Sequence, residues 1–133
     1  MRDPCRRLLS AHGGGRIEAT STIEVVQEFV HVRARRRSRL EAVTLARQYM
    51  VALPLLVTRP EDLDLGLALV ERYPALGAFD AVLATVALNQ RVEALVSADR
   101  AFGEVPNLPW ADPATPNLEH LIGRRSCSLV VAA

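Results

Sequence analysis

Lysine is absent from this chain of 133 residues, in which arginine supplies all 16 basic side chains. A P-loop nucleotide site needs a lysine on the phosphates, and a Schiff-base enzyme needs a lysine amine, so neither chemistry is available here. Genomic base composition is the ordinary explanation for the bias. The two exclusions hold whatever its cause.

Long apolar runs and closely spaced cysteines are also missing. No apolar stretch approaches the roughly 20 residues that a bilayer span requires. The first seven residues lead only into the short apolar pair Leu8-Leu9, which does not fit a signal peptide. Cys5 and Cys127 lie near opposite ends without metal-type spacing, so we expect unpaired thiols. These features predict a cytoplasmic protein with no membrane segment.

The remaining composition is that of one globular domain. Half of the residues are hydrophobic, 23% are charged and the formal net charge is +1, which excludes a disordered chain or a polycation. The periodicity predicts strands at 16–20, 53–58, 93–97 and 108–111, and helices at 2–12, 21–33, 39–51, 58–74 and 79–89. This alternation predicts an α/β fold of three layers, with a parallel sheet between helical layers. We expect the domain to occupy 1–122, with 123–133 as a C-terminal tail that the pattern does not place.

Three carboxylates stand at junctions between predicted elements. Glu28 lies among apolar residues of the second helix, Asp80 opens the apolar helix at 79–89, and Asp99 follows the strand at 93–97. An unpaired charge next to core residues is costly unless a cation or water meets it. Taken singly, Asp80 can be a helix-start acid and Asp99 a turn former. Converging on one spot, the three would make a hard-cation site.

Other polar residues have simpler interpretations. Ser21 and Glu24 match a capping box at the start of the second helix, so we interpret Glu24 as a capping acid and not as a site residue. Ser97 can either hydrogen-bond a site acid or simply end its strand. The three histidines are scattered and lack an obvious serine or cysteine partner.

Together, the helix bearing Glu28 and the segments 79–87 and 96–102 resemble the PIN-domain nucleases, in particular the VapC toxins of bacterial toxin–antitoxin pairs. The resemblance extends from about residue 2 to residue 113. It implies an α/β/α endoribonuclease that uses Mg²⁺ or Mn²⁺ held by four acids, three of which map onto Glu28, Asp80 and Asp99. It also implies a homodimer and neutralisation by a small VapB-type antitoxin, whose C-terminal segment lies across the active-site groove. Carboxylate-held Mg²⁺ can activate water and neutralise phosphate without a protein nucleophile.

The sequence departs from this family at its start. Family members begin with a strand that ends in an Asp and lies at the centre of the sheet, whereas Met1 leads directly into the first predicted helix. The domain therefore looks N-terminally incomplete, and without a central strand its neighbours would expose unpaired backbone groups. We expect this chain, as written, to be poorly stable and weakly active. The second hypothesis is accordingly a truncated, inactive PIN-like protein that still binds antitoxin. A phosphoaspartate domain is a third interpretation, which the absence of lysine disfavours.

An arginine cluster follows the second helix, with five guanidinium groups between residues 33 and 39. Arginine suits phosphate because its fork donates two parallel hydrogen bonds. We name Arg33, Arg36, Arg37 and Arg100 as candidate RNA contacts. The alternatives are a solvated loop or an antitoxin contact.

Overall fold

A computed structural model describes residues 10–123 and 127–132. Its centre is one sheet of five strands, all parallel, in the order β2-β1-β5-β3-β4. The strands are β1 (Ile17–Thr22), β2 (Leu55–Leu56), β3 (Ala94–Val96), β4 (Trp110–Ala111) and β5 (Cys127–Val131). Apolar side chains alternate between the two faces, so that Leu129 joins one buried cluster and Val130 the other. A sheet that is buried on both faces is characteristic of parallel α/β domains.

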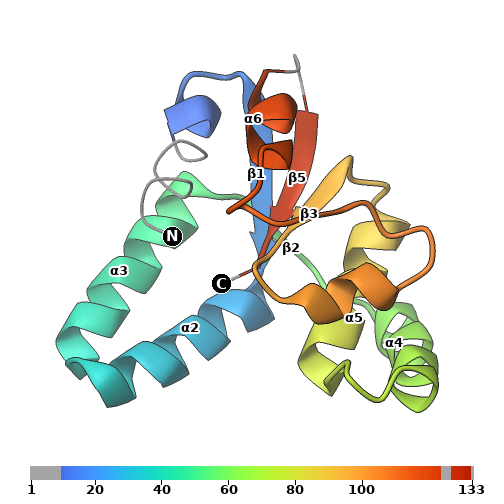
Figure 1. The fold of residues 1–133 in the computed structure, drawn as a ribbon. Helices are drawn as coiled ribbons and strands as arrows, with labels where there is room; N and C mark the ends of the chain where they lie inside the picture. Colours follow the sequence, from blue (N-terminus) through green and yellow to red (C-terminus); the bar gives the residue numbers. More distant parts are fainter. Residues whose placement is uncertain (1–9, 124–126, 133) are drawn as a thin grey trace.

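Helices surround this sheet (Figure 1). They are α2 (Ile23–Arg36), α3 (Arg39–Ala52), α4 (Pro60–Arg72), α5 (Ala78–Asn89), the 3₁₀ helix η1 (Arg100–Glu104) and α6 (Asn117–Ile122), and residues 10–13 are also helical. α4 and α5 pack together on one side, whereas α2 and α3 form a hairpin that reaches away from the sheet. The predicted α/β class with a parallel sheet between helices is confirmed. None of the described helices combines the length and apolarity that a membrane span requires.

The central strand comes from the segment that the sequence analysis assigned to a tail. β5 pairs with β1 on one side and with β3 on the other, and Cys127, Leu129 and Val130 are fully buried. Two side chains of β1 add to the backbone pairing, because the Thr20 hydroxyl donates to the Leu129 carbonyl and the Ser21 hydroxyl to the Val131 carbonyl. β5 thus occupies the middle of the sheet, where the resemblance places the first strand of the family. The sheet has no central gap, so the reason for expecting poor stability does not apply to it.

Several local predictions are confirmed, and three of the four predicted strands are shorter than expected, whereas β1 extends to Thr22. Ser38 caps α3 by accepting a hydrogen bond from the Glu41 backbone N–H at 3.0 Å. α5 is buried along most of its length, and β4 lies at the edge of the sheet. β2 has only two residues, Leu55 and Leu56, because its single neighbour β1 turns into α2 at Ile23.

A buried polar network fixes α4 against α5. Asp62 is 5% exposed and accepts a hydrogen bond from the Asn89 amide at 2.6 Å and from the Arg59 backbone N–H at 2.8 Å. The Thr85 hydroxyl donates to the Asp62 carbonyl at 2.7 Å. Because buried polar groups are costly when unpaired, these bonds select one register between the two helices. That register also fixes the first turn of α5, which carries Asp80.

Substituting Gly66 tests this helix contact. A Cβ atom at Gly66 would lie 2.9 Å from Val82 Cγ2 and 3.0 Å from Val82 Cα, which is too close without movement of α5. We expect Gly66→Ala to lower the free energy of unfolding by about 1–3 kcal/mol, as overpacking does. In the control Gly13→Ala the added Cβ meets nothing within 4 Å. Urea unfolding of both variants measures the difference, and equal stabilities would show that the two helices are not in this close contact.

Candidate functional site

The three predicted acids lie toward the carboxyl ends of β1 and β3. Glu28 lies on the second turn of α2, which directly follows β1, and Asp99 follows β3. Asp80 is the third residue of α5 and reaches the same place from the helical layer. Glu28 and Asp99 are exposed, whereas Asp80 is half-buried. Ligand sites of parallel α/β sheets lie at this edge.

Asp80 is influenced by both of the other carboxylates. The pKa of Asp80 is raised to about 6, first by burial and then by the negative charges of Asp99 and Glu28. When protonated, Asp80 also shares a hydrogen bond with the Asp99 carboxylate, which raises its pKa further. The neighbouring charges thus favour the protonated form of Asp80.

The position of Asp99 is set by the turn after β3. The buried Ser97 hydroxyl accepts a hydrogen bond from the Asp99 backbone N–H at 3.1 Å, and the Asp99 carboxylate accepts one from the Ala101 backbone N–H at 2.9 Å. The Trp110 indole N–H donates to the Ser97 carbonyl at 2.9 Å. Ser97 therefore acts on the backbone of the turn, and one Asp99 oxygen caps η1.

The interpretation of Glu24 as a capping acid is wrong. β1 runs through Thr22, and the Thr22 hydroxyl caps α2 by accepting from the Val25 backbone N–H at 3.2 Å. The cap is one residue later than predicted, so Glu24 is not at the capping-box position. Its carboxylate instead accepts a hydrogen bond from the Thr58 hydroxyl at 3.0 Å. Ser21 and Thr22 are both good caps, and the sequence alone does not distinguish between them.

A cavity of about 510 Å³ opens beside these acids and is lined by Glu24, Glu28 and Asp80. Its remaining walls come from the start of α2, from the loop between β2 and α4, from the first turn of α4 and from the first two turns of α5; they are Thr22, Val25, Thr58, Arg59, Pro60, Leu63, Ala78, Phe79, Val82 and Leu83. The lining is mostly apolar, as in many ligand sites. Arg59 and Phe79 were not predicted as site residues, because nothing in their local sequence indicates that they face a cavity.

The donor set fits a hard divalent cation, since all three groups are carboxylates under mutual repulsion. Within residues 10–123 and 127–132, no three acid, histidine or cysteine side chains are close enough to hold a metal ion as they stand. Glu28, Asp80 and Asp99 are the residues of this region that could hold such a cation.

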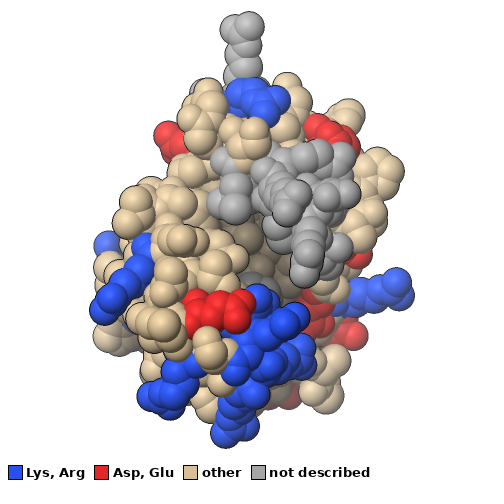
Figure 2. Space-filling model, turned by 90° about the vertical axis from the view of Figure 1, so that its left-hand side faces the viewer, with Lys and Arg blue, Asp and Glu red and all other residues tan. Residues whose placement is uncertain are grey.

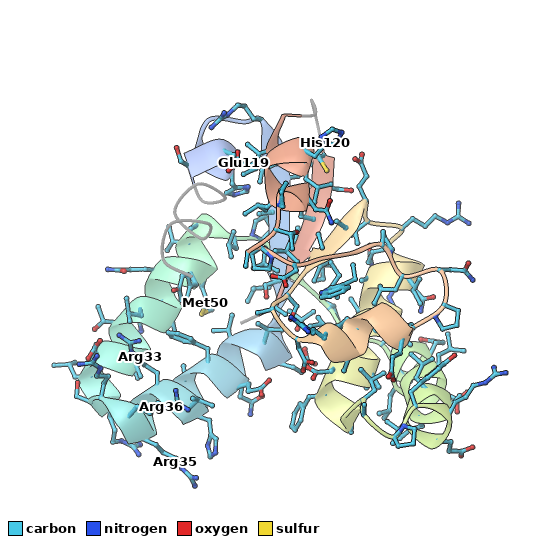
Figure 3. The ribbon with its side chains drawn as sticks, in the orientation of Figure 1. Arg33, Arg35, Arg36, Met50, Glu119 and His120 are labelled. Carbon is cyan, nitrogen blue, oxygen red and sulfur yellow. The ribbon has the colours of Figure 1, made fainter. Side chains whose placement is uncertain are left out.

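The four candidate RNA contacts differ in exposure and pairing in the structure. Arg33 forms an ion pair with Glu41 at 2.7 Å between α2 and α3, and is half-buried. Arg36, Arg37 and Arg100 are exposed, and Arg100 opens η1 beside Asp99. Figure 3 shows Arg33, Arg35 and Arg36 gathered toward the far end of α2. α2 continues to Arg36, beyond the predicted end at residue 33. Arg35 and Arg36 are therefore helical, and the helix sets the directions of their side chains.

Sequence comparison agrees with the fold. The PIN domain family matches residues 2–108, so the chain belongs to the PIN-domain family. Within that family it is of the VapC type: it is 45% identical to ribonuclease VapC7 of Mycobacterium tuberculosis over 130 residues, which cover 94% of this chain and 88% of that protein. No solved structure matches the chain.

Proposed function

We propose that this protein is a ribonuclease toxin that hydrolyses RNA phosphodiester bonds with a divalent cation, Mg²⁺ or Mn²⁺, held by Glu28, Asp80 and Asp99. The observation that carries the proposal is the position of Asp80, whose pKa is raised to about 6 by burial and by the nearby negative charges of Asp99 and Glu28. The 45% identity to a ribonuclease supports RNA as the substrate. Perturbed carboxylates in a cleft are typical of functional sites.

Each part of the site has a task in this reaction. A divalent cation, when bound, would supply charge neutralisation for the phosphate and a lowered pKa for attacking water. Glu28 and Asp80 hold their carboxylates at the cavity wall, while Asp99 approaches Asp80 from the strand side. The Ser97 hydroxyl keeps the Asp99 backbone in its turn.

Metal dependence is tested directly with the purified chain. We expect the chain to cleave a mixed RNA pool in millimolar Mg²⁺ or Mn²⁺ and not to cleave it in excess EDTA. Cleavage should return when either metal is restored. Isothermal titration with Mn²⁺ in the absence of RNA measures the same site independently of activity. Cleavage that persists at full rate in EDTA would contradict the proposal.

The VapC relationship supports two further partners. We infer that a VapB-type antitoxin covers the cavity and blocks cleavage, and that the chain forms a homodimer. Adding the antitoxin encoded with this chain should abolish cleavage at equimolar ratio. Light scattering of the free chain gives its mass, and a monomer at micromolar concentration would contradict the homodimer.

A further inference from the structure

A second groove, of about 1010 Å³, continues from the acidic cavity along α2 toward the hairpin end. The two hollows share three lining residues, Glu24, Glu28 and Phe79, so they adjoin one another. At the far end the lining includes Arg35 and Arg39. Glu28 and Arg35 lie seven residues apart on one helix, which separates them by about 10 Å along its axis.

Phe79 stands where the two hollows meet. It is 70% exposed, although it is the residue before Asp80 in the first turn of a helix that is otherwise mostly buried. An aromatic ring exposed to this degree is costly in water and is available to stack with a planar ligand. Bases of single-stranded nucleic acid stack on such rings regardless of sequence, because every base has a π face.

The arginines of the hairpin differ in their surroundings. Arg33 is engaged with Glu41, and Arg36 and Arg37 are exposed without lining the groove, whereas Arg35 and Arg39 are exposed and line it. Figure 2 shows blue side chains gathered toward the lower end of the face that carries the hairpin, so this end of the molecule is basic. The groove therefore passes from an acidic end to a basic end.

We propose that this groove is the binding track for single-stranded RNA. Phe79 stacks a base beside the three acids, and Arg35 and Arg39 contact phosphates on the strand leading away from them. The charge pattern fits such a ligand, because phosphates need the guanidinium groups at one end and a cation between the carboxylates at the other. A single strand fits better than a duplex, since only unpaired bases present their faces to a side chain. This inference rests on the proposed function and names the residues by which that site would hold its substrate.

The test measures RNA affinity in the Asp99→Asn background, so that cleavage does not interfere. The probe is a fluorescein-labelled 12-nucleotide single-stranded RNA, followed by anisotropy at several salt concentrations. We expect Arg35→Gln/Arg39→Gln to weaken binding about tenfold or more and to reduce the salt slope by about 1.4, because each lost phosphate contact on a single strand removes about 0.7. Phe79→Ala should weaken binding about tenfold, whereas Phe79→Tyr should retain it.

The matched control is Arg72→Gln/Arg91→Gln, which removes the same charge from two exposed arginines that line neither hollow. We expect it to change affinity less than about threefold, as a distant screened charge does. Equal losses in the two double variants would overturn the track in favour of diffuse attraction. Unchanged RNA affinity in Arg35→Gln/Arg39→Gln would also overturn the track. The groove would then be interpreted as a protein-binding surface. Thermal unfolding of each variant confirms that the fold is intact.

The experiments distinguish failure of the RNA-binding track from failure of the proposed hydrolysis. If the parent chain fails to cleave RNA with either metal but the binding pattern appears, hydrolysis fails and the track stands. If the parent chain cleaves RNA and the variants bind alike, the track fails and hydrolysis stands.

Discussion

Asp80→Asn should abolish RNA cleavage while leaving the fold intact or more stable. The substitution removes one of three carboxylates and preserves the size of the side chain. We expect a loss of at least about a hundredfold in kcat. A cation held by fewer carboxylates binds more weakly, and its position relative to the phosphate is less well defined. A cleavage assay at saturating Mn²⁺, together with Mn²⁺ titration calorimetry, measures the two effects separately.

The stability of Asp80→Asn distinguishes a functional acid from a structural one. In the absence of metal, burial and the charges of Asp99 and Glu28 disfavour ionised Asp80, which is why its pKa is raised from 3.8 to about 6. A group with a raised pKa in the folded state costs stability progressively as pH rises from the unfolded value through the folded one. At pH 7 in EDTA the neutral Asn should therefore raise the melting temperature. A lower melting temperature would assign Asp80 to the structure instead.

The control for this pair of measurements is Asp64→Asn. Asp64 is an exposed acid on α4 that lines neither hollow, and its substitution changes the net charge by the same amount. We expect Asp64→Asn to cleave RNA and to bind Mn²⁺ as well as the wild-type chain does. A comparable loss in Asp64→Asn would mean that net charge, and not a shared site, explains the effect at Asp80.

The second large effect concerns β5. Leu129 is fully buried at the centre of the sheet, opposite Ala19 on one side and Ala94 on the other. Leu129→Ala leaves a cavity that the two alanines cannot fill, so we expect a loss of about 2–5 kcal/mol in the free energy of unfolding. That loss is a large share of the total stability of about 5–15 kcal/mol in typical domains. Leu129→Asp would bury an unpaired charge and should prevent folding.

Ser128→Ala provides the comparison within the same strand. Ser128 is only half-buried, and its backbone carbonyl, which accepts from the Glu93 N–H at 2.9 Å, is retained in the variant. We expect a change below about 1 kcal/mol, as for most substitutions away from the core. Urea unfolding of the two variants gives the difference. If Leu129→Ala is as stable as Ser128→Ala, β5 does not occupy the middle of the sheet.

The sequence predicted features that depend on neighbouring residues and missed those that depend on distant ones. Ser38 was recognised as a cap and α5 as a buried helix because capping and periodicity are local signals. β5 was not recognised, because its short apolar run pairs with β1 about 110 residues earlier, and nothing local indicates such a partner. The cap of α2 was misplaced by one residue, which hid the place of Glu24 beside the cavity.

The site shows the same division. Glu28, Asp80 and Asp99 were named from their positions at element ends, and the structure brings their charges within mutual influence. Their metal-binding and catalytic roles stay predictions. The direction in which each arginine points depended on where α2 ends and how α3 packs against it. Arg35 and Arg39, which line the groove, were therefore not separated from Arg36 and Arg37 by sequence alone.

The order of the strands has a consequence for the timing of folding. β1 and β3 are not neighbours in the sheet, and only β5, the last of the five to be synthesised, joins them. Until β5 is inserted, nothing in the sheet holds the start of α2, with Glu28, next to the turn that carries Asp99. Pairing strands so far apart in sequence is also a slow step in folding. A newly made chain thus passes through an interval in which the three acids are not yet assembled at one edge of the sheet.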